Sequence, residues 1–229
     1  MENKKIIHYP LSIIRYPFMK GNLIIISSPS GGGKGTLIKE VLKIVPNIGY
    51  SVSYSTRLMR IGEENGRDYF FVSRAEFESL IGQDEFLEYA EVHGNFYGTS
   101  INQIKSKIDS GQDVVLEIDV QGAASVRAKI PEAVSIFILP PSFEVLANRL
   151  IARATEKKED LTLRLKNSFA ETRRVSEFEY VVVNDDISEA AARLKTIILA
   201  ERLKRIRQTE AIQGILDSFD TSKISSLGD

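Results

Sequence analysis

The residues of this chain most able to do chemistry form a glycine-rich loop suited to holding phosphate groups. Residues 28–36 read Ser-Pro-Ser-Gly-Gly-Gly-Lys-Gly-Thr; an apolar run at 23–26 precedes them, and apolar residues with helical spacing follow at 37–42. A helix that begins after such a turn presents backbone N–H groups with no partner inside the helix, and these groups bind anions. Lys34 adds a positive charge where the outer phosphates of a nucleotide would lie. The pattern therefore predicts a polyphosphate-binding site.

The loop departs from the usual pattern G-x-x-x-x-G-K-[ST] at two positions. Ser28 stands where the first Gly is usual, and Gly35 stands where a hydroxyl residue is usual, with Thr36 one residue later. A magnesium ion that arrives with a nucleotide would therefore lack its ordinary hydroxyl ligand from the loop. Three interpretations stay open: water replaces that ligand, Thr36 supplies it, or catalysis is weakened.

Length and composition limit the classes of function that are open to the chain. Its 229 residues are enough for one large domain or for a core with inserted subdomains. A net charge of −1 gives no electrostatic basis for a nucleic-acid partner, and the lack of cysteine excludes disulfides. The uncharged stretch near the N-terminus is too short to span a bilayer, and no signal-peptide pattern follows it. We expect a cytoplasmic protein without a membrane partner.

Strand-like runs alternate with helical patterns along most of the chain. Continuous Val, Ile and Leu runs with helices between them are typical of a parallel sheet that is covered on both faces, which places the chain in the α/β class. Ligands bind such sheets outside the carboxyl ends of the strands, where the glycine-rich loop also falls. The expected strands are residues 23–27, 50–54, 113–118, 134–139 and 180–183, and a last helix is expected from residue 188.

Residues 55–98 interrupt this alternation. Short aromatic fragments with strand character occur there at 69–72 and 86–89. The stretch predicts a small separate lobe inserted into the core. It also gathers residues able to bind a charged ligand: Arg57, Arg60, Arg67, Tyr69, Glu88 and Tyr97.

With these features in view, the chain resembles the guanylate kinase family. The resemblance rests on an ordered set of blocks that covers about residues 21–206. The blocks are Ser-Pro-Ser-Gly-Gly-Gly-Lys (28–34), Ser-Val-Ser-Tyr-Ser-Thr-Arg (51–57) with Arg60, Gly-Glu (62–63), Gly66 and Asp-Tyr (68–69), Phe-Leu-Glu (86–88), Gly-Asn-Phe-Tyr-Gly-Thr (94–99), Ile-Asp-Val-Gln-Gly (118–122), Ile-Phe-Ile-Leu-Pro-Pro-Ser (136–142) and Val-Asn-Asp-Asp (183–186).

The resemblance implies an α/β fold of the P-loop nucleoside monophosphate kinase type, with a parallel sheet core flanked by helices, an inserted GMP-binding lobe and a mobile lid. It implies an N-terminal extension at 1–20, a guanylate kinase-like domain at 21–208 and a C-terminal tail at 209–229. Within the domain, the expected parts are a core at about 21–52, 104–145 and 173–208, a GMP-binding lobe at about 53–103, and a lid at about 146–172.

The activity that the resemblance implies is transfer of the γ-phosphoryl group of ATP to GMP, and also to dGMP, with Mg²⁺ as cofactor. ATP and GMP are the expected partners, and the residues that hold the metal are not specified. The expected catalytic residues are Lys34 and the lid arginines Arg149, Arg153 and Arg164. The expected ATP-binding residues are Ser28, Pro29, Ser30, Gly31, Gly32, Gly33, Lys34, Gly35, Thr36 and Asn184.

The GMP-binding residues follow from the same resemblance. Forked guanidinium groups and phenolic hydroxyls suit a phosphate dianion. The guanine edge offers N1–H and N2 amino donors to a carboxylate, and adenine lacks this pair, so a matching site would reject adenine. The expected phosphate-binding residues are Arg57, Arg60, Tyr69 and Tyr97, and those expected at the base are Ser53, Glu88, Thr99 and Asp119.

Two other functions stay open beside this one. A non-catalytic guanylate-kinase-like module would bind a phosphorylated peptide in the GMP lobe, but such modules usually lack the loop lysine that this chain keeps at position 34. A kinase of another nucleoside monophosphate is suggested by the ending Gly-Lys-Gly-Thr, whereas Glu88 and Asp119 favour guanine. The departures from the family's usual residues are Gly35, Met59, Glu117 and Ala152.

Overall fold

A parallel sheet of five strands forms the centre of the computed structural model, which describes residues 21–92, 94–153 and 158–219. The expected N-terminal extension, residues 1–20, lies outside the described residues. The strand order is β2-β7-β1-β8-β9, and every neighbouring pair is parallel. The strands are β1 (Leu23–Ser27), β2 (Ile48–Tyr50), β7 (Asp113–Glu117), β8 (Val134–Leu139) and β9 (Tyr180–Val183).

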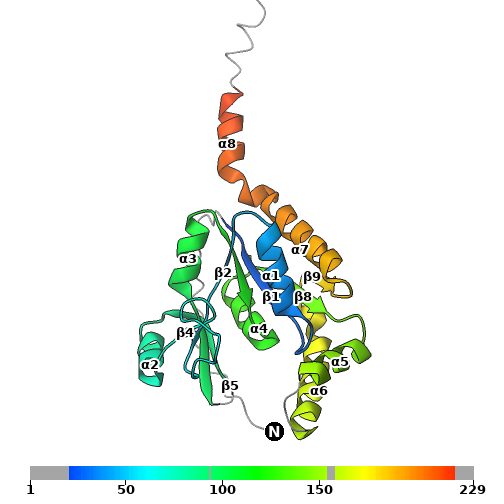
Figure 1. Ribbon diagram of the computed structural model, residues 1–229. Helices are drawn as coiled ribbons and strands as arrows, with labels where there is room; N and C mark the ends of the chain where they lie inside the picture. The colour runs from blue at the N-terminus through cyan, green and yellow to red at the C-terminus, as the bar shows by residue number, and fades with distance from the viewer. Residues whose placement is uncertain (1–20, 93, 154–157, 220–229) are drawn as a thin grey trace, which may run out of the picture.

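Helices cover both faces of this sheet (Figure 1). Leu23 and Ile25 of β1 pack on the side of α3 (Ile101–Asp109) and α4 (Val120–Lys129). Ile24 and Ile26 of β1 pack on the other side, against α1 (Lys34–Ile44) and α7 (Ile187–Arg202). Because successive side chains of a strand point to opposite faces, a strand between two layers of helices must be apolar throughout. The expected α/β class is confirmed.

A second sheet of four strands lies beside the core (Figure 1), in the order β4-β3-β6-β5. Helix α2 (Arg74–Gly82) begins with a capping box and places Phe77 in a small aromatic core of this lobe. Its strands span residues 54–100, one residue more at the start and two more at the end than the interrupted stretch 55–98. Its strands are β3 (Tyr54–Ser55), β4 (Phe70–Phe71), β5 (Phe86–Val92) and β6 (Asn95–Ser100).

The chain leaves the core sheet and returns to it at neighbouring points. It leaves after β2 and comes back through α3, which starts directly after β6. The ammonium of Lys107 on α3 donates a hydrogen bond to the carbonyl oxygen of Tyr50 at the end of β2, at 2.7 Å. This contact joins the two ends of the inserted lobe.

The expected strand at 50–54 is wrong as a single element. β2 ends at Tyr50, and β3 begins at Tyr54 in the other sheet. The backbone N–H of Ser51 still donates to the carbonyl of Val115 at 3.0 Å, after which the chain crosses from one sheet to the other. The alternation of aromatic or apolar residues with serine at 50–54 therefore indicates extended backbone, but it does not show that the segment contributes to two sheets.

The remaining elements lie at the other side of the core and at the C-terminal end. Helices α5 (Phe143–Arg153) and α6 (Lys158–Thr172) lead through the short 3₁₀ helix η1 (Arg173–Glu177) to β9. After α7 come a second 3₁₀ helix, η2 (Arg205–Arg207), and α8 (Thr209–Ser218). The start of the expected tail is thus helical, and Figure 1 shows α8 extending away from the body.

Asp113 is a buried carboxylate that joins several elements at the start of β7. Its Oδ1 accepts from the backbone N–H of Asn22 at 2.7 Å and from the side-chain amide of Asn22 at 3.0 Å. Its Oδ2 accepts from Nε of Arg202, at the end of α7, at 2.7 Å. The same guanidinium donates to the carbonyl of Pro46 at 2.7 Å, which adds the segment between α1 and β2.

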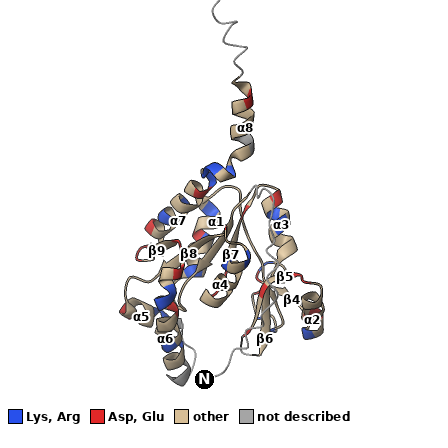
Figure 2. Ribbon diagram, turned by 180° about the vertical axis from the view of Figure 1, so that it is seen from behind, with Lys and Arg blue, Asp and Glu red and all other residues tan. Residues whose placement is uncertain are grey.

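Charges of both signs are spread over the surface. Figure 2 shows Lys and Arg interspersed with Asp and Glu along the helices, in line with the net charge of −1. Among the described residues, the structure contains no helix with the length and apolar character that crossing a membrane requires.

Candidate active site

The glycine-rich loop joins β1 to α1 and lines an open pocket of about 250 Å³. Gly31 and Gly33 have φ angles of 83° and 87°, in the left-handed region that favours glycine. A Cβ atom at Gly33 would lie 2.3 Å from Nδ2 of Asn184, so only glycine fits there. Residues 28–35 line the pocket together with Glu117, Asp119 and Glu171, whereas Thr36 is exposed and is not among the lining residues.

Lys34 opens α1 and points across this pocket. Its ammonium donates to the carbonyl of Ile118 at 3.0 Å, at the carboxyl end of β7. Burial lowers the pKa of Lys34, and the nearby carboxylates of Glu117, Asp119 and Glu171 oppose that shift. The pocket therefore combines one lysine with carboxylates and a ring of backbone groups.

Two of the expected lid arginines reach the loop from α5 and α6. The guanidinium of Arg149 donates to the carbonyl of Asn184 at 3.0 Å and to that of Gly32 at 3.5 Å. The guanidinium of Arg164 lies 3.5 Å from Oγ of Ser30. Arg153 is the last residue of α5, and its side chain lies outside the described part of the structure.

Helix α6 brings two further residues to the loop that the sequence analysis missed. The hydroxyl of Ser168 donates to the carbonyl of Ser30 at 3.1 Å, and the carboxylate of Glu171 accepts from the backbone N–H of Ser30 at 2.9 Å. With Arg164, these residues are spaced i, i+4 and i+7, which places them on one face of a helix. That spacing was the available signal.

Asn184 holds the loop from the end of β9. Its side-chain amide donates to the carbonyl of Gly32 at 2.9 Å, and the residue is buried. It is therefore near the loop, as expected of an ATP-binding residue, although the contact in the structure is to the backbone of the loop itself.

The residues expected at the guanine base meet where the inserted lobe faces α4. The hydroxyl of Thr99 on β6 donates to Oε1 of Glu88 on β5 at 2.5 Å. Asp119 is the N-cap of α4, and its Oδ1 accepts from the backbone N–H groups of Gln121 at 3.0 Å and Gly122 at 2.8 Å. A Cβ atom at Gly122 would lie 3.4 Å from Oε2 of Glu88 and 3.5 Å from Oδ1 of Asp119. The carboxylates of Glu88 and Asp119 therefore both lie close to Gly122.

Glu88 is the most perturbed carboxyl group of this cluster. Burial raises its pKa to about 7, and the charge of Asp119 adds to the shift, while the hydrogen bond from Thr99 opposes it. Perturbed carboxyl groups gather at functional sites. Ser53 lies just before β3, where its carbonyl accepts from the backbone N–H of Phe70 at 2.9 Å.

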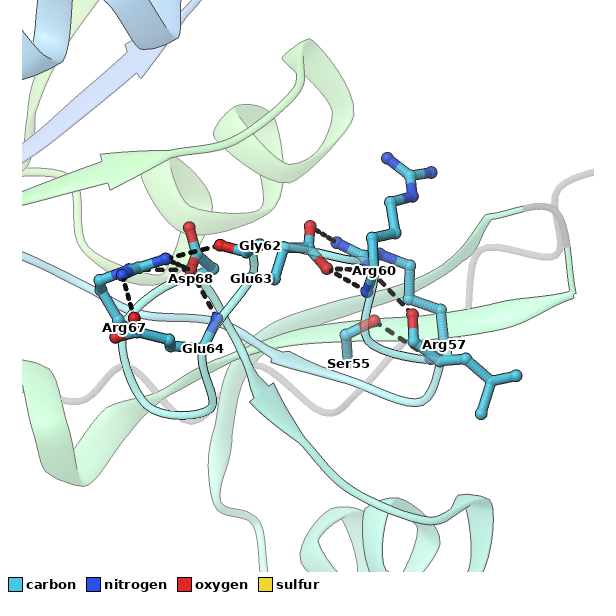
Figure 3. Close-up of polar contacts among 9 residues, drawn as sticks. Ser55, Arg57, Arg60, Gly62, Glu63, Glu64, Arg67 and Asp68 are labelled. Carbon is cyan, nitrogen blue, oxygen red and sulfur yellow. Dashed lines mark hydrogen bonds and ion pairs between the residues drawn. The ribbon is translucent and has the colours of Figure 1, made fainter.

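The residues expected at the GMP phosphate surround an ion pair that Figure 3 draws. Arg57 donates from Nη1 and Nη2 to the two carboxylate oxygens of Glu63, at 2.7 and 2.6 Å. The backbone N–H of Arg60 donates to the same carboxylate at 2.8 Å. The hydrogen bonds from Arg57 and Arg60 hold the pKa of Glu63 at about 2.

Aromatic rings flank the guanidinium of Arg57, whose Cζ lies 4.8 Å from the ring centroid of Tyr69. The rings of Tyr69 and Tyr97 are 5.9 Å apart. In Figure 3 the exposed side chain of Arg60 extends away from Glu63. The structure therefore brings together Arg57, Tyr69 and Tyr97, and it adds Glu63, to which the sequence analysis gave no role.

A doubly covered parallel sheet with a lysine-bearing glycine loop at the carboxyl end of β1 defines a P-loop protein of the nucleotide kinase class. Comparison with known families refines this class. The family described as guanylate kinase matches residues 20–201, and the chain belongs to that family.

Individual relatives agree with this assignment. The guanylate kinase of Neisseria meningitidis serogroup A is 51% identical over 88% of this chain and 98% of the relative. That of Thermotoga maritima is 45% identical over 85% of this chain and 94% of the relative. Among solved structures, the guanylate kinase of Anaplasma phagocytophilum is 39% identical, with a TM-score of 0.68 over 82% of this chain and 89% of that chain. The resemblance stated from the sequence is confirmed.

Proposed function

We propose that this protein is an ATP:GMP phosphotransferase that makes ADP and GDP and also accepts dGMP. The observation that carries the proposal is the position of Asp119. It lines the phosphate pocket beside Lys34, and it also faces the carboxylate of Glu88 across Gly122. A nucleotide base held at Glu88 would therefore lie close to the place where the phosphates of a second nucleotide bind.

The acceptor nucleotide would be bound through both its phosphate and its base. We assign its phosphate to Arg57, Arg60, Tyr69 and Tyr97, because a guanidinium fork and phenolic hydroxyls complement a dianion. We assign the guanine base to Glu88 and Asp119, with hydroxyls that complete its recognition. A carboxylate accepts from guanine N1–H and the N2 amino group, and adenine offers no such pair of donors. The hydroxyl residues are Ser53 and Thr99.

The donor would lie along the glycine-rich loop, with Lys34 at its outer phosphates. An oxygen of the GMP phosphate attacks the γ-phosphorus, the new O–P bond forms in line with the bond to the β-phosphate oxygen, and ADP leaves. Such transfer depends on positioning and charge stabilisation. We assign this role to Lys34, Arg149, Arg153 and Arg164, and we assign loop and adenosine contacts to residues 28–36 and Asn184.

We propose Mg²⁺ as the ion that accompanies ATP. The described residues contain no group of three or more His, Asp or Glu side chains that could hold a metal by themselves. Mg²⁺ is usually held by one or two carboxylates together with substrate phosphates and water, and the pocket offers Glu117 and Asp119. These residues fit the ion, which when bound would neutralise charge on the phosphates.

The test is ADP release from Mg-ATP with GMP, AMP, CMP and UMP in turn. We expect turnover with GMP alone, and we expect Lys34→Ala to lower kcat by about 10²–10³, as the loss of one charge-stabilising group does. Lys39→Ala changes an exposed lysine of the same helix and is the matched control. A folded protein that binds GMP without turnover would contradict the proposal and favour a binding module. A cytoplasmic location and the lack of a nucleic-acid or membrane partner stay predictions.

A further inference from the structure

Gly35 and Glu117 face each other in the phosphate-binding pocket. Gly35 lies in the first turn of α1, and Glu117 is the last residue of β7. A Cβ atom at Gly35 would lie 3.4 Å from Oε1 and 3.8 Å from Oε2 of Glu117, and apart from its chain neighbours and the backbone of its own helix no other atom of the described residues lies within 4 Å of that position. A side chain at position 35 would therefore point toward this carboxylate.

The carboxylate of Glu117 is held from one side. The hydroxyl of Tyr50, at the end of β2, donates to Oε2 at 3.2 Å. Among the described residues, Oε1 accepts no hydrogen bond, and it is the oxygen nearer to the Cβ direction of Gly35. One oxygen is anchored and the other faces the pocket.

We propose that Glu117 supplies the oxygen ligand for nucleotide-bound Mg²⁺ that the loop lacks at Gly35. This inference rests on the proposed Mg-ATP site. A loop of the usual pattern ends in Lys-Ser or Lys-Thr and offers a hydroxyl to the ion. Here glycine leaves that place open, and a carboxylate one methylene longer than aspartate reaches toward it. The longer carboxylate at position 117 then compensates for the missing hydroxyl at position 35.

The other two interpretations of Gly35 have less support. Thr36 is exposed and does not line the pocket, whereas Glu117 lines it and lies beside Gly35. Replacement by water alone would leave Glu117 as a charge partner of Lys34 and an acceptor for Tyr50, with its Oε1 still facing the open place at Gly35. Oxygen from a carboxylate is a ligand that Mg²⁺ takes readily, since it is a hard cation that prefers charged oxygen.

The test compares the dissociation constant of a non-hydrolysable ATP analogue in Mg²⁺ with that in EDTA, by calorimetry on the full chain. The ratio of the two constants is the metal effect, and it is read without turnover. We expect Glu117→Asp and the isosteric Glu117→Gln each to reduce the metal effect about tenfold, which corresponds to about 1.4 kcal/mol. The constant in EDTA should stay within about twofold of the original because the fold is kept.

The decisive variant is the double substitution Gly35→Ser with Glu117→Asp. A serine hydroxyl at that position returns the usual ligand, so we expect the metal effect to recover to within about threefold of the unmodified protein. Glu40→Gln removes one carboxylate from the exposed side of the same helix and is the matched control. It should leave the metal effect unchanged.

Three results would overturn the inference. The first is a metal effect that survives Glu117→Gln. The second is a loss with Glu117→Asp that is the same whether position 35 is glycine or is changed to serine, because the two positions would then act independently. The third is an unmodified protein that binds the analogue equally with and without Mg²⁺, which would overturn the proposed Mg-ATP site as well.

Discussion

Glu88 is a carboxyl group whose ionisation depends on its surroundings. Burial and the neighbouring charge of Asp119 raise its pKa to about 7, against an ordinary value of 4.5. Between these two values the folded protein binds a proton that the unfolded chain does not, so this group favours folding at the acidic end of the range and loses that contribution as the pH rises toward 7. The proposed contact with guanine needs the ionised form.

The pH dependence of GMP binding follows from this pKa. Below pH 7, GMP must displace the proton of Glu88 before the carboxylate can accept from the base. We expect the apparent dissociation constant for GMP to rise by about tenfold for each pH unit below 7. Calorimetric titration of GMP between pH 5.5 and 8.5 measures it.

Glu88→Gln separates this effect from the ionisation of the GMP phosphate. The phosphate titrates equally with both proteins, so the difference between their pH profiles belongs to Glu88. Parallel profiles would contradict the assignment of Glu88 to the base.

Glu63 acts on the acceptor site through Arg57. It holds the guanidinium with two hydrogen bonds of 2.7 and 2.6 Å and also fixes the backbone of Arg60. A guanidinium group that is already oriented loses less conformational entropy when it binds a phosphate. We expect Glu63→Ala to raise the KM for GMP about tenfold, with kcat and the KM for ATP within about twofold, as steady-state kinetics would measure.

The neighbouring carboxylate provides the control. Glu64 pairs with Arg67 at 2.6 Å on the exposed surface, so Glu64→Ala should leave the KM for GMP unchanged. A lower KM for GMP in Glu63→Ala would mean that the carboxylate competes with the phosphate for Arg57, and the positioning role would be wrong.

Among the elements, α4 begins at a residue with two tasks. Asp119 caps the helix through Oδ1 and is also assigned to the base. Asparagine is as good an N-cap as aspartate, whereas alanine is not. We therefore expect Asp119→Asn to keep the free energy of unfolding within about 0.5 kcal/mol while raising the KM for GMP, and Asp119→Ala to lower that free energy by about 1 kcal/mol as well.

Urea unfolding and steady-state kinetics on the two variants measure the two effects separately. If Asp119→Asn destabilised the fold as much as Asp119→Ala, the charge rather than the cap would hold the start of α4. If neither variant changed the KM for GMP, the assignment to the base would fail.

Local patterns predicted most of the elements of the core. The strands at 23–27, 134–139 and 180–183 have the expected bounds, because each is a short run of mostly apolar residues that a helix or loop of different pattern follows. The run at 50–54 was misread, since alternation of residue types does not reveal that the chain changes sheets. The helix at 209–218 was expected only as part of a tail, because its exposed apolar residues, such as Ile215 and Leu216, pack on no core that the sequence could indicate.

The parts of the candidate site that lie in one continuous stretch of sequence could be predicted. The loop around Lys34 is such a segment, with strand, glycines and helix in sequence order. Ser168 and Glu171 share one face of a helix with Arg164, but this spacing does not indicate which element that face contacts, and their hydrogen bonds to Ser30 are seen only in the structure. Glu63 was quoted within the resemblance, but its ion pair with Arg57 depends on how the loop between them folds back.

At the scale of the whole molecule, Asp113 at the start of β7 connects Asn22, just before β1, to Arg202 of α7. Arg202 reaches it from α7, and the side chain of Asp113 is 3% exposed. Within the described part of the chain, removal of the guanidinium would leave this buried carboxylate with only the two donors of Asn22. We expect Arg202→Ala to lower the free energy of unfolding by about 2 kcal/mol, as urea denaturation would measure.

A second arginine of α7 is the matched control. Arg193 pairs with Asp185 and Glu189 on the surface and is 46% exposed, so Arg193→Ala should change the free energy of unfolding by less than about 0.5 kcal/mol. Equal losses in the two variants would mean that the buried carboxylate contributes nothing special.

The contact between Lys107 and the carbonyl of Tyr50 has a consequence for how such a molecule can change its specificity. It brings the two junctions of the inserted lobe to one place on the core. The lobe carries its own aromatic core around Phe77, enters and leaves the core at one place, and also packs against α4 through β5. A lobe with a different base pocket could therefore be grafted at the same two junctions, with the first residues of α4 changed to match it, while the sheet and its phosphate loop stay as they are.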